Sequence, residues 1–346
     1  MRFTGLHVAV VPFPALGDLT IYLRLAQAFS EAGAKVVYLS DHLAPAAARF
    51  DWLQVVPFAG AEARRLLADF DLVVWDVGVS PAVGEGDKAA ALAKLAHEYA
   101  HLALVTSKDL PGELEQINLP LVVAGCELGP RCATFCRDTK AGLTMVDWVD
   151  RYAHECFGLK VPEASPRLAK ALDSARAAKK AVIFPTTPNP KKNYWPRGFR
   201  KLARELAGSG WEVSFVVVPA ELSRLEAEYQ PFPVRAFSDL AGLIDYLRDG
   251  CIVISNDSGG GHLASMMGLH TVTITRKPPD FVWRPGFNRA NHVLSPLLTF
   301  KLGGGHVWRP FVPYWRIPAL AQAAWQTKVG AKTGASPRTA AGGHLV

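Results

Sequence analysis

The chain has 346 residues, of which 49% are hydrophobic and 20% are charged. This composition excludes a wholly disordered, collagen-like or coiled-coil protein, and the length predicts two domains, since one typical core takes roughly 100 to 200 residues. Residues 1–165 carry 14 Lys and Arg against 20 Asp and Glu, whereas residues 166–346 carry 24 against 11. The basic second half favours an anionic partner, such as a nucleotide phosphate, a nucleic acid or an anionic membrane surface, although a merely basic surface gives the same count.

The apolar runs are too short to cross a membrane. The run from Val8 to Phe13 also lacks the small-residue cleavage site of a secretion signal. We therefore expect a cytoplasmic protein whose contact with the inner membrane is at most peripheral. The spacing of Cys126, Cys132 and Cys136 matches neither zinc nor iron–sulfur patterns, so no metal site is expected.

The first 110 residues alternate short β-branched runs with amphipathic runs, which predicts β–α–β units and a parallel sheet. The expected strands are residues 6–13, 35–40, 52–58, 72–76 and 102–106. The expected helices are residues 18–32, 62–69 and 88–100.

A second α/β series follows residues 161–180, whose Pro, Ala and Lys content predicts a linker with a short helix. Its expected strands are residues 181–184, 213–218, 234–237, 251–255 and 271–275. Its expected helices are residues 198–207, 221–229, 240–248 and 262–267. We therefore predict two Rossmann-like, doubly wound domains, residues 1–165 and 166–315, that face each other across a cleft.

Beyond residue 276 the sequence is irregular and rich in Trp, Pro and Gly, which fits either loops that close over the cleft or plain aromatic packing. Residues 316–333 contain a helical run, 318–329, which we expect to cross back over the first domain. The tail, 334–346, is expected to be disordered.

The most informative motif lies between a buried strand and a helix, in the run CIVISNDSGGGHLASMMG that begins at Cys251. A glycine-rich turn at a helix start offers backbone N–H groups and a partial positive charge to an anion, so we predict a diphosphate site there. The alternative is an ordinary strand-to-helix turn capped by an aspartate. The residues concerned are Asp257, Ser258, Gly259, Gly260, Gly261 and His262.

Two other segments occupy similar places at the ends of predicted strands. The first is PALGD, which ends at Asp18, and the second is IFPTTPNPKKNYWP, which begins at Ile183. The glycine-rich turn matches neither the dinucleotide fingerprint GxGxxG nor the Walker pattern, which disfavours a dehydrogenase or a P-loop enzyme.

Together and in this order, the three segments resemble glycosyltransferase family nine, the lipopolysaccharide heptosyltransferases. The resemblance implies a GT-B fold with an N-terminal acceptor domain and a C-terminal nucleotide-sugar domain. It also implies a metal-independent, inverting transferase without a cofactor, which moves a sugar, most simply heptose from ADP-heptose, to a hydroxyl of a lipopolysaccharide-core or related glycan in the bacterial cell envelope.

The same resemblance assigns roles to residues. It implies that Asp18 is the catalytic base, although Asp is also favoured as a helix N-cap. It further implies donor contacts from the strand-end segments of the second domain, with the choice between the two lysines left open by a longer spacing to Trp195. These donor residues are Thr186, Thr187, Lys191, Lys192 and Glu221, together with the turn at 257–262.

The acceptor side of the predicted cleft departs from the family pattern. Asp76 ends a predicted strand, so we expect it to face the cleft and to contact the acceptor. The family usually has His and Pro soon after the Gly-Asp pair, whereas this chain has Leu19 and Thr20, so its acceptor side differs. The rival hypotheses are a nucleotide-sugar epimerase on the same frame and a noncatalytic nucleotide-sugar or nucleic-acid-binding protein, although no nucleic-acid motif supports the last.

Overall fold

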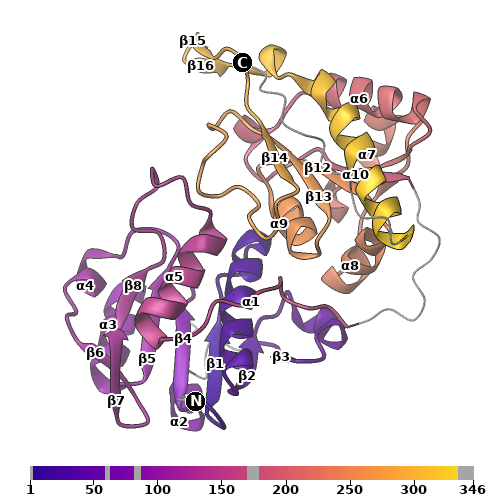
Figure 1. Ribbon diagram of the computed structural model, residues 1–346. Helices are drawn as coiled ribbons and strands as arrows, with labels where there is room; N and C mark the ends of the chain where they lie inside the picture. The colour runs from indigo at the N-terminus through magenta and orange to yellow at the C-terminus, as the bar shows by residue number, and fades with distance from the viewer. Residues whose placement is uncertain (1–2, 59–62, 82–86, 170–178, 334–346) are drawn as a thin grey trace, which may run out of the picture.

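The computed structural model describes residues 3–58, 63–81, 87–169 and 179–333, and it forms two lobes that meet through helices (Figure 1). The expected tail and the expected short helix of the linker fall on or partly on residues outside these ranges. Among the described residues, no helix has both the length and the apolar character that crossing a bilayer requires.

The first domain is built on a six-stranded parallel sheet in the order β3-β2-β1-β4-β5-β8. Its strands are β1 (His7–Val11), β2 (Lys35–Leu39), β3 (Gln54–Val56), β4 (Leu72–Asp76), β5 (Leu102–Thr106) and β8 (Cys132–Thr134). Its helices are α1 (Leu16–Glu31), α2 (Ala63–Asp69), α3 (Lys88–Glu98), α4 (Gly112–Glu115) and α5 (Met145–Phe157). An antiparallel pair, β6 (Pro120–Val123) and β7 (Cys126–Pro130), lies beside this sheet.

The second domain repeats the plan with the order β11-β10-β9-β12-β13-β14. Its strands are β9 (Lys180–Phe184), β10 (Glu212–Val216), β11 (Val234–Arg235), β12 (Ile252–Asn256), β13 (His270–Ile274) and β14 (Asn291–Leu294). Its helices are α6 (Pro196–Gly208), α7 (Leu222–Tyr229), α8 (Leu240–Arg248), α9 (Gly259–Met266) and α10 (Ile317–Thr333). A hairpin, β15 (Phe300–Leu302) and β16 (Gly305–Val307), stands apart from this sheet.

The predicted pair of doubly wound domains is confirmed, and both sheets reverse their strand order at the same place. The reversal lies between β1 and β4 in the first domain and between β9 and β12 in the second. Loops that leave neighbouring strands in opposite directions open a crevice at this point, which is where open α/β sheets bind ligands. The residues that follow these four strands therefore border the expected ligand crevice.

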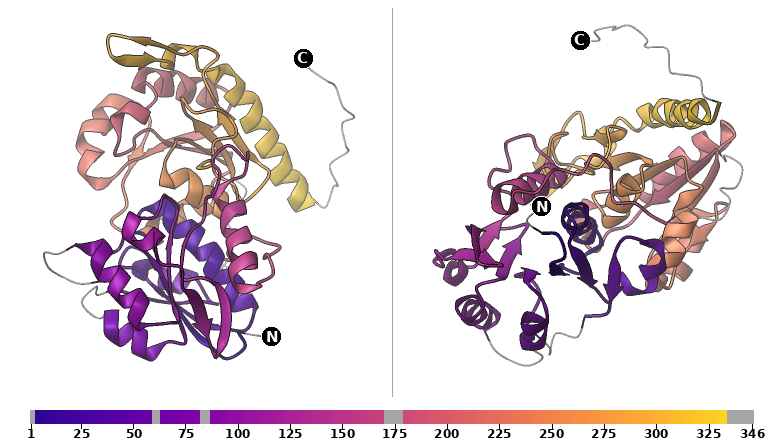
Figure 2. Two further views of the ribbon diagram at one scale, coloured as in Figure 1. Left: turned by 90° about the vertical axis from the view of Figure 1, so that its left-hand side faces the viewer. Right: turned by 60° about the horizontal axis from the view of Figure 1, so that its bottom comes forward.

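The sequence did not predict every element. Each sheet has a sixth strand, β8 or β14, and α5 packs against α1. The C-terminal helix α10 does not cross back as we expected, because it packs on α6 and β12 of its own domain, with Ile317, Ala321 and Ala324 buried in that core. Figure 2 shows α10 beside the second domain in both views.

The two domains share a continuous apolar interface at α1 and α9. These helices pack directly against each other, and buried side chains from both, among them Leu23 and Leu263, belong to one hydrophobic cluster. The side chains of this cluster are at most 8% exposed, and removal of apolar surface from water is the main favourable contribution to packing. The interface therefore fixes the start of α1 against the start of α9.

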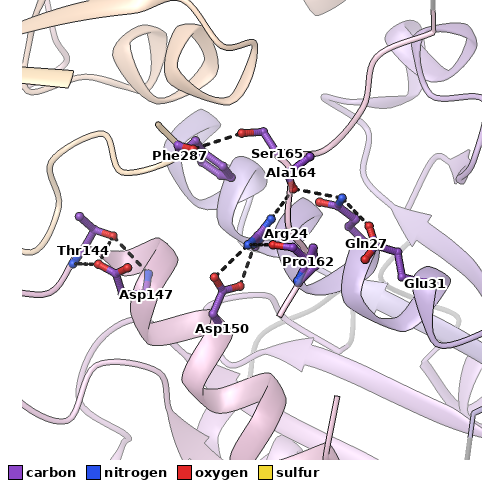
Figure 3. Close-up of polar contacts among 10 residues, drawn as sticks. All are labelled: Arg24, Gln27, Glu31, Thr144, Asp147, Asp150, Pro162, Ala164, Ser165 and Phe287. Carbon is purple, nitrogen blue, oxygen red and sulfur yellow. Dashed lines mark hydrogen bonds and ion pairs between the residues drawn. The ribbon is translucent and has the colours of Figure 1, made fainter. Parts of the chain in front are cut away.

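The chain between the domains is tied to the first domain by Arg24 on α1 (Figure 3). Its Nε and Nη2 donate to the carboxylate of Asp150 on α5 at 2.8 and 3.0 Å, and it also donates to the carbonyls of Pro162 and Ala164 at 2.6 and 2.5 Å. The next residue, Ser165, donates to the carbonyl of Phe287 in the second domain at 3.3 Å. Every part of the buried guanidinium charge thus has an acceptor nearby, as a buried cation requires.

We expect Arg24→Met to lower the free energy of unfolding by about 3 to 5 kcal/mol, because it leaves Asp150, whose side chain is only 15% exposed, without its cation. Urea denaturation followed by circular dichroism measures this loss. The matched control is Arg64→Met, which removes an exposed ion pair with Glu98 and should cost less than about 1 kcal/mol. Equal losses in the two variants would contradict the assignment of Arg24 as the tie between helix and linker.

Candidate functional site

A cavity of about 410 Å³ lies between the domains, at the carboxyl ends of the sheets. Its first-domain wall comes from residues after β1, β4 and β5, and its second-domain wall comes from the start of α9 and the loops beside it. The predicted residues that line it are Asp18, Asp76, Lys192, Asp257, Ser258, Gly259 and His262. Residues from three separate sequence motifs are therefore brought to one space.

Asp18 lies in the first turn of α1, two residues after Leu16, the first residue of the helix. The N-cap of this helix is Ala15, without a side-chain cap, so Asp18 is not the N-cap that the alternative interpretation required. Burial and then the negative charge of Asp76 raise the pKa of Asp18 to about 6, against the hydrogen bond from Ser107 and the charge of Lys108, which lower it. A carboxyl with a pKa near the working pH can exchange a proton efficiently.

Asp76 ends β4 and is held by two hydrogen bonds. Tyr22 donates to one carboxylate oxygen at 2.5 Å, and the backbone N–H of Gly78 donates to the other at 2.6 Å. Burial raises the pKa of Asp76, and these two bonds lower it. Because both of its oxygens are already used, Asp76 is better placed to orient a hydroxyl and to raise the pKa of Asp18 than to accept a proton itself.

The opposite wall of the cavity carries the start of α9. Ser258 is its N-cap, but its side chain makes no capping bond, and its buried Oγ has no hydrogen-bond partner among the described residues. The first amides of any helix lack intrahelical acceptors and carry part of the positive end of the helix dipole. A free hydroxyl beside such amides is what an anion site at a helix start provides.

Two lysines stand next to this helix start. The Nζ atoms of Lys192 and Lys277 lie 3.1 and 2.9 Å from the same carboxylate oxygen of Asp257, and both lysines line the cavity. The two ammonium groups carry two positive charges, and the carboxylate of Asp257 neutralises one of them, which leaves a net charge of one. Lys277 was not predicted as a site residue, although its position two residues after the predicted strand 271–275 was a usable signal.

His262, a donor-site residue in the sequence prediction, lines the cavity with a ring that is bonded to its own domain. It is 4% exposed, and burial lowers its pKa to about 4, so the ring is neutral at neutral pH. With Nε2 donating to the carbonyl of Trp283 at 3.2 Å, Nδ1 is an acceptor. The ring of Trp283 packs edge-on against His262 and also lines the cavity, so this part of the irregular segment does border the cleft.

The three glycines of the turn serve packing. A Cβ at Gly259 would lie 2.6 Å from the Cβ of Leu16, one at Gly260 would lie 2.8 Å from the ring of Phe184, and one at Gly261 would lie 2.7 Å from the Oγ of Ser255. Our sequence interpretation attributed these glycines to the approach of a diphosphate. In the structure, the absence of a side chain at these three glycines allows α9 to pack closely against α1 and against the ends of the central strands β9 and β12.

The remaining predicted donor residues lie outside the lining of this cavity. Thr186 donates to Glu221 at 2.7 Å, which joins the ends of β9 and β10. Thr187 donates to Asn193 at 2.8 Å, and Lys191 is an exposed residue of the 3₁₀ turn Pro190–Lys192. The structure thus distinguishes the two lysines, since Lys192 faces the cavity and Lys191 does not line it.

Comparison with known proteins agrees with this arrangement. Residues 140–300 match the model of glycosyltransferase family 9 (heptosyltransferase). This match spans a little under half of the chain, from the end of the first domain through most of the second. The match confirms the predicted resemblance to this family and the prediction of a glycosyltransferase. A search of curated proteins finds no match.

Several solved structures share the fold of the whole chain. One is the E. coli ADP-heptose LPS heptosyltransferase II, with 16% identity, a TM-score of 0.65, and coverage of 93% of this chain and 99% of that one. The E. coli heptosyltransferase WaaC with ADP has 16% identity, a TM-score of 0.64 and coverage of 92% and 99%. A family 9 glycosyl transferase from Veillonella parvula has 13% identity, a TM-score of 0.65 and coverage of 94% and 99%. The GT-B fold is therefore confirmed.

We expect Gly259→Ala to lower the free energy of unfolding by about 1 to 3 kcal/mol, because its Cβ would push the first turns of α1 and α9 apart. Thermal or urea denaturation checks this. The matched control is Gly208→Ala at the end of α6, where nothing lies within 4 Å of the new Cβ, so the variant should be unchanged or slightly more stable. If both variants are equally stable, the close helix contact does not hold the domains together.

Proposed function

We propose that this protein transfers a sugar from a nucleoside-diphosphate sugar to a hydroxyl group of a glycan acceptor. The observation that carries the proposal is the opposition of two kinds of charge across one cavity. Asp18, a carboxyl group with a pKa of about 6, stands on the first-domain wall. The start of α9 and the ammonium groups of Lys192 and Lys277 stand on the second-domain wall.

The second-domain wall has the chemistry of a leaving-group site. When the bond between sugar and diphosphate breaks, negative charge grows on the departing diphosphate. Fixed ammonium groups and helix-start amides stabilise that charge without a metal ion, and the hydroxyl of Ser258 can add a donor. The pair Thr186 and Glu221 lies farther along the same sheet edge and suits the nucleoside part of the donor.

The first-domain wall has the chemistry of a general base. Ionised Asp18 accepts the proton of the acceptor hydroxyl as the new bond between that oxygen and the anomeric carbon forms, while the bond to the diphosphate breaks on the opposite side of the ring. Direct displacement of this kind inverts the anomeric configuration. Asp76 orients the acceptor and keeps the pKa of Asp18 high enough for proton transfer.

The donor and acceptor are inferred from the family. Similar structures are titled for ADP-heptose and ADP, so we propose ADP-heptose as donor. A glycan of the lipopolysaccharide core, or a related envelope glycan, is the matching acceptor. On the acceptor side of the cavity, Lys88 and Lys108 add positive charge. A lipid-linked acceptor would also place the protein at the inner face of the cytoplasmic membrane.

For the donor site, we expect ADP at about 100 times its dissociation constant to stabilise the protein by about 2.7 kcal/mol. Lys192→Ala and Lys277→Ala should each weaken ADP binding by about tenfold or more, because each removes a charge-assisted hydrogen bond. Isothermal titration measures the affinities. Lys191→Ala is the matched control. This variant should bind ADP nearly as well as the wild type, because Lys191 does not line the cavity. The donor site would be wrong if no ADP, UDP or GDP compound shifts the melting temperature.

For the base, we expect Asp18→Asn to lower kcat by a factor of roughly 10² to 10⁴ with ADP affinity retained. The wild-type rate should rise with pH through about 6, where Asp18 ionises. Ser107→Ala should move that rise to higher pH, because the Ser107 hydroxyl lowers the pKa of Asp18. Steady-state kinetics with a soluble acceptor measure all three.

The same substitution also has a stability signature. The pKa of Asp18 is raised in the folded state, so the folded protein binds more protons than the unfolded chain between pH 4 and 6, and stability falls as pH rises through this range. Asp18→Asn removes that cost and should be more stable than the wild type at pH 8, by about 1 to 3 kcal/mol. If Asp18→Asn transfers sugar at the wild-type rate, Asp18 is not the base.

A further inference from the structure

The last part of the chain has an unusual charge pattern. From Phe281 to the C-terminus the sequence contains eight Lys and Arg residues and no Asp or Glu. The proposed catalytic site uses none of these eight side chains. The surface made by this segment therefore carries positive charge that no acidic residue of the same segment offsets.

Within this segment, residues 297–302 expose apolar side chains. Of the eight large apolar side chains that are exposed in the described part of the chain, four lie in these six residues. Leu297 and Leu302 are 68% exposed, Leu298 is 52% exposed and Phe300 is 42% exposed. A cluster of this kind on a soluble domain marks a contact surface, because isolated apolar residues are common and contiguous ones are not.

A tight hairpin presents this cluster. Strands β15 and β16 pair with each other, and Gly303 and Gly304 form the turn with φ angles of +56° and +77°, which favour glycine. The hairpin projects from the edge of the second domain that lies farthest from the first domain (Figures 1 and 2). At its base, the ring of Phe300 packs at 6.0 Å from that of Phe311, and the N–H of Leu297 donates to the carbonyl of Phe311.

Two cations lie close to the apolar cluster. Lys301 lies within the hairpin, and desolvation together with the charges of Arg276 and Lys301 lowers the pKa of His306 on β16, which places Arg276 nearby as well. Later in the segment, the 3₁₀ turn Tyr314–Arg316 exposes Trp315, at 56%, and Arg316. In the hairpin, exposed aliphatic side chains, the exposed ring of Phe300 and a flanking Lys and Arg form the combination that binds the interface of an anionic membrane.

We propose that the hairpin segment 297–302 inserts into the headgroup region of an anionic lipid bilayer, with Lys301 and Arg276 on the lipid phosphates. A second copy of the chain fits this surface less well, because two such faces would bring like charges together. A nucleic acid would use the cations but would leave the leucines exposed to water. This inference names the surface that would make the membrane contact of the proposed function. It rests on that function only for its biological meaning.

The test is cosedimentation of the full chain with vesicles, in the absence of any donor or acceptor. We expect binding to vesicles of phosphatidylcholine and phosphatidylglycerol, little binding to phosphatidylcholine alone, and release at high salt. The double variant Leu297→Ser with Leu302→Ser should bind at least about tenfold more weakly, because it removes the apolar insertion. Lys301→Glu should weaken binding to the anionic vesicles only.

The matched control is Val161→Ser, which removes an apolar side chain of similar exposure, 49%, from the linker on the first domain and should bind as the wild type does. All variants should keep the wild-type melting temperature, since the replaced side chains are exposed. The proposal is overturned if the wild type ignores anionic vesicles or if the double serine variant binds them as tightly as the wild type. It is also overturned if the hairpin instead mediates a dimer or nucleic-acid binding that the double variant loses. A failure here leaves ADP binding and sugar transfer untouched, so it is distinguishable from a failure of the proposed function.

Discussion

The close contact between the first turns of α1 and α9 is the constraint on which the site depends. At Gly259 the two helices approach so closely that a single Cβ would strike Leu16. The contact is apolar behind the first turns, where both helices belong to one buried cluster, and it leaves the two helix starts facing the same cavity. A base on one domain and an anion site on the other can act on one substrate only if this contact fixes their separation.

The electrostatics of the cavity follow from that geometry. The start of α1 carries the positive end of a helix dipole and should favour an ionised Asp18. Burial and the nearby Asp76 oppose this and prevail, so the pKa rises to about 6. Across the cavity, Lys192 and Lys277 share the single carboxylate of Asp257, which leaves net positive charge for a diphosphate. The acidic and basic halves of the sequence thus meet at the site with their charges in opposition.

Sequence patterns predicted the parts of this account that depend on local periodicity and strand ends. Strands such as 72–76 and 102–106 were predicted with the bounds that the structure has, because buried parallel strands are short β-branched runs. Asp76 was predicted to face the cleft because it ends such a strand. The role of Asp18 came from the family resemblance, and that of Asp257 from the glycine-rich turn before a helix. Lys277 and the strand β14 lie in irregular sequence whose structure is set by tertiary contacts. The path of α10 depends on which core buries Ile317, and periodicity alone does not tell one core from another.

The most direct test of the central claim is a crystal structure of the protein with ADP bound. We expect the β-phosphate at the start of α9, within about 3 Å of the backbone N–H groups there and of the Nζ of Lys277 or Lys192, on the side of the cavity opposite Asp18. A diphosphate bound away from the start of α9, or bound there with both lysines still held only by Asp257, would contradict the central claim.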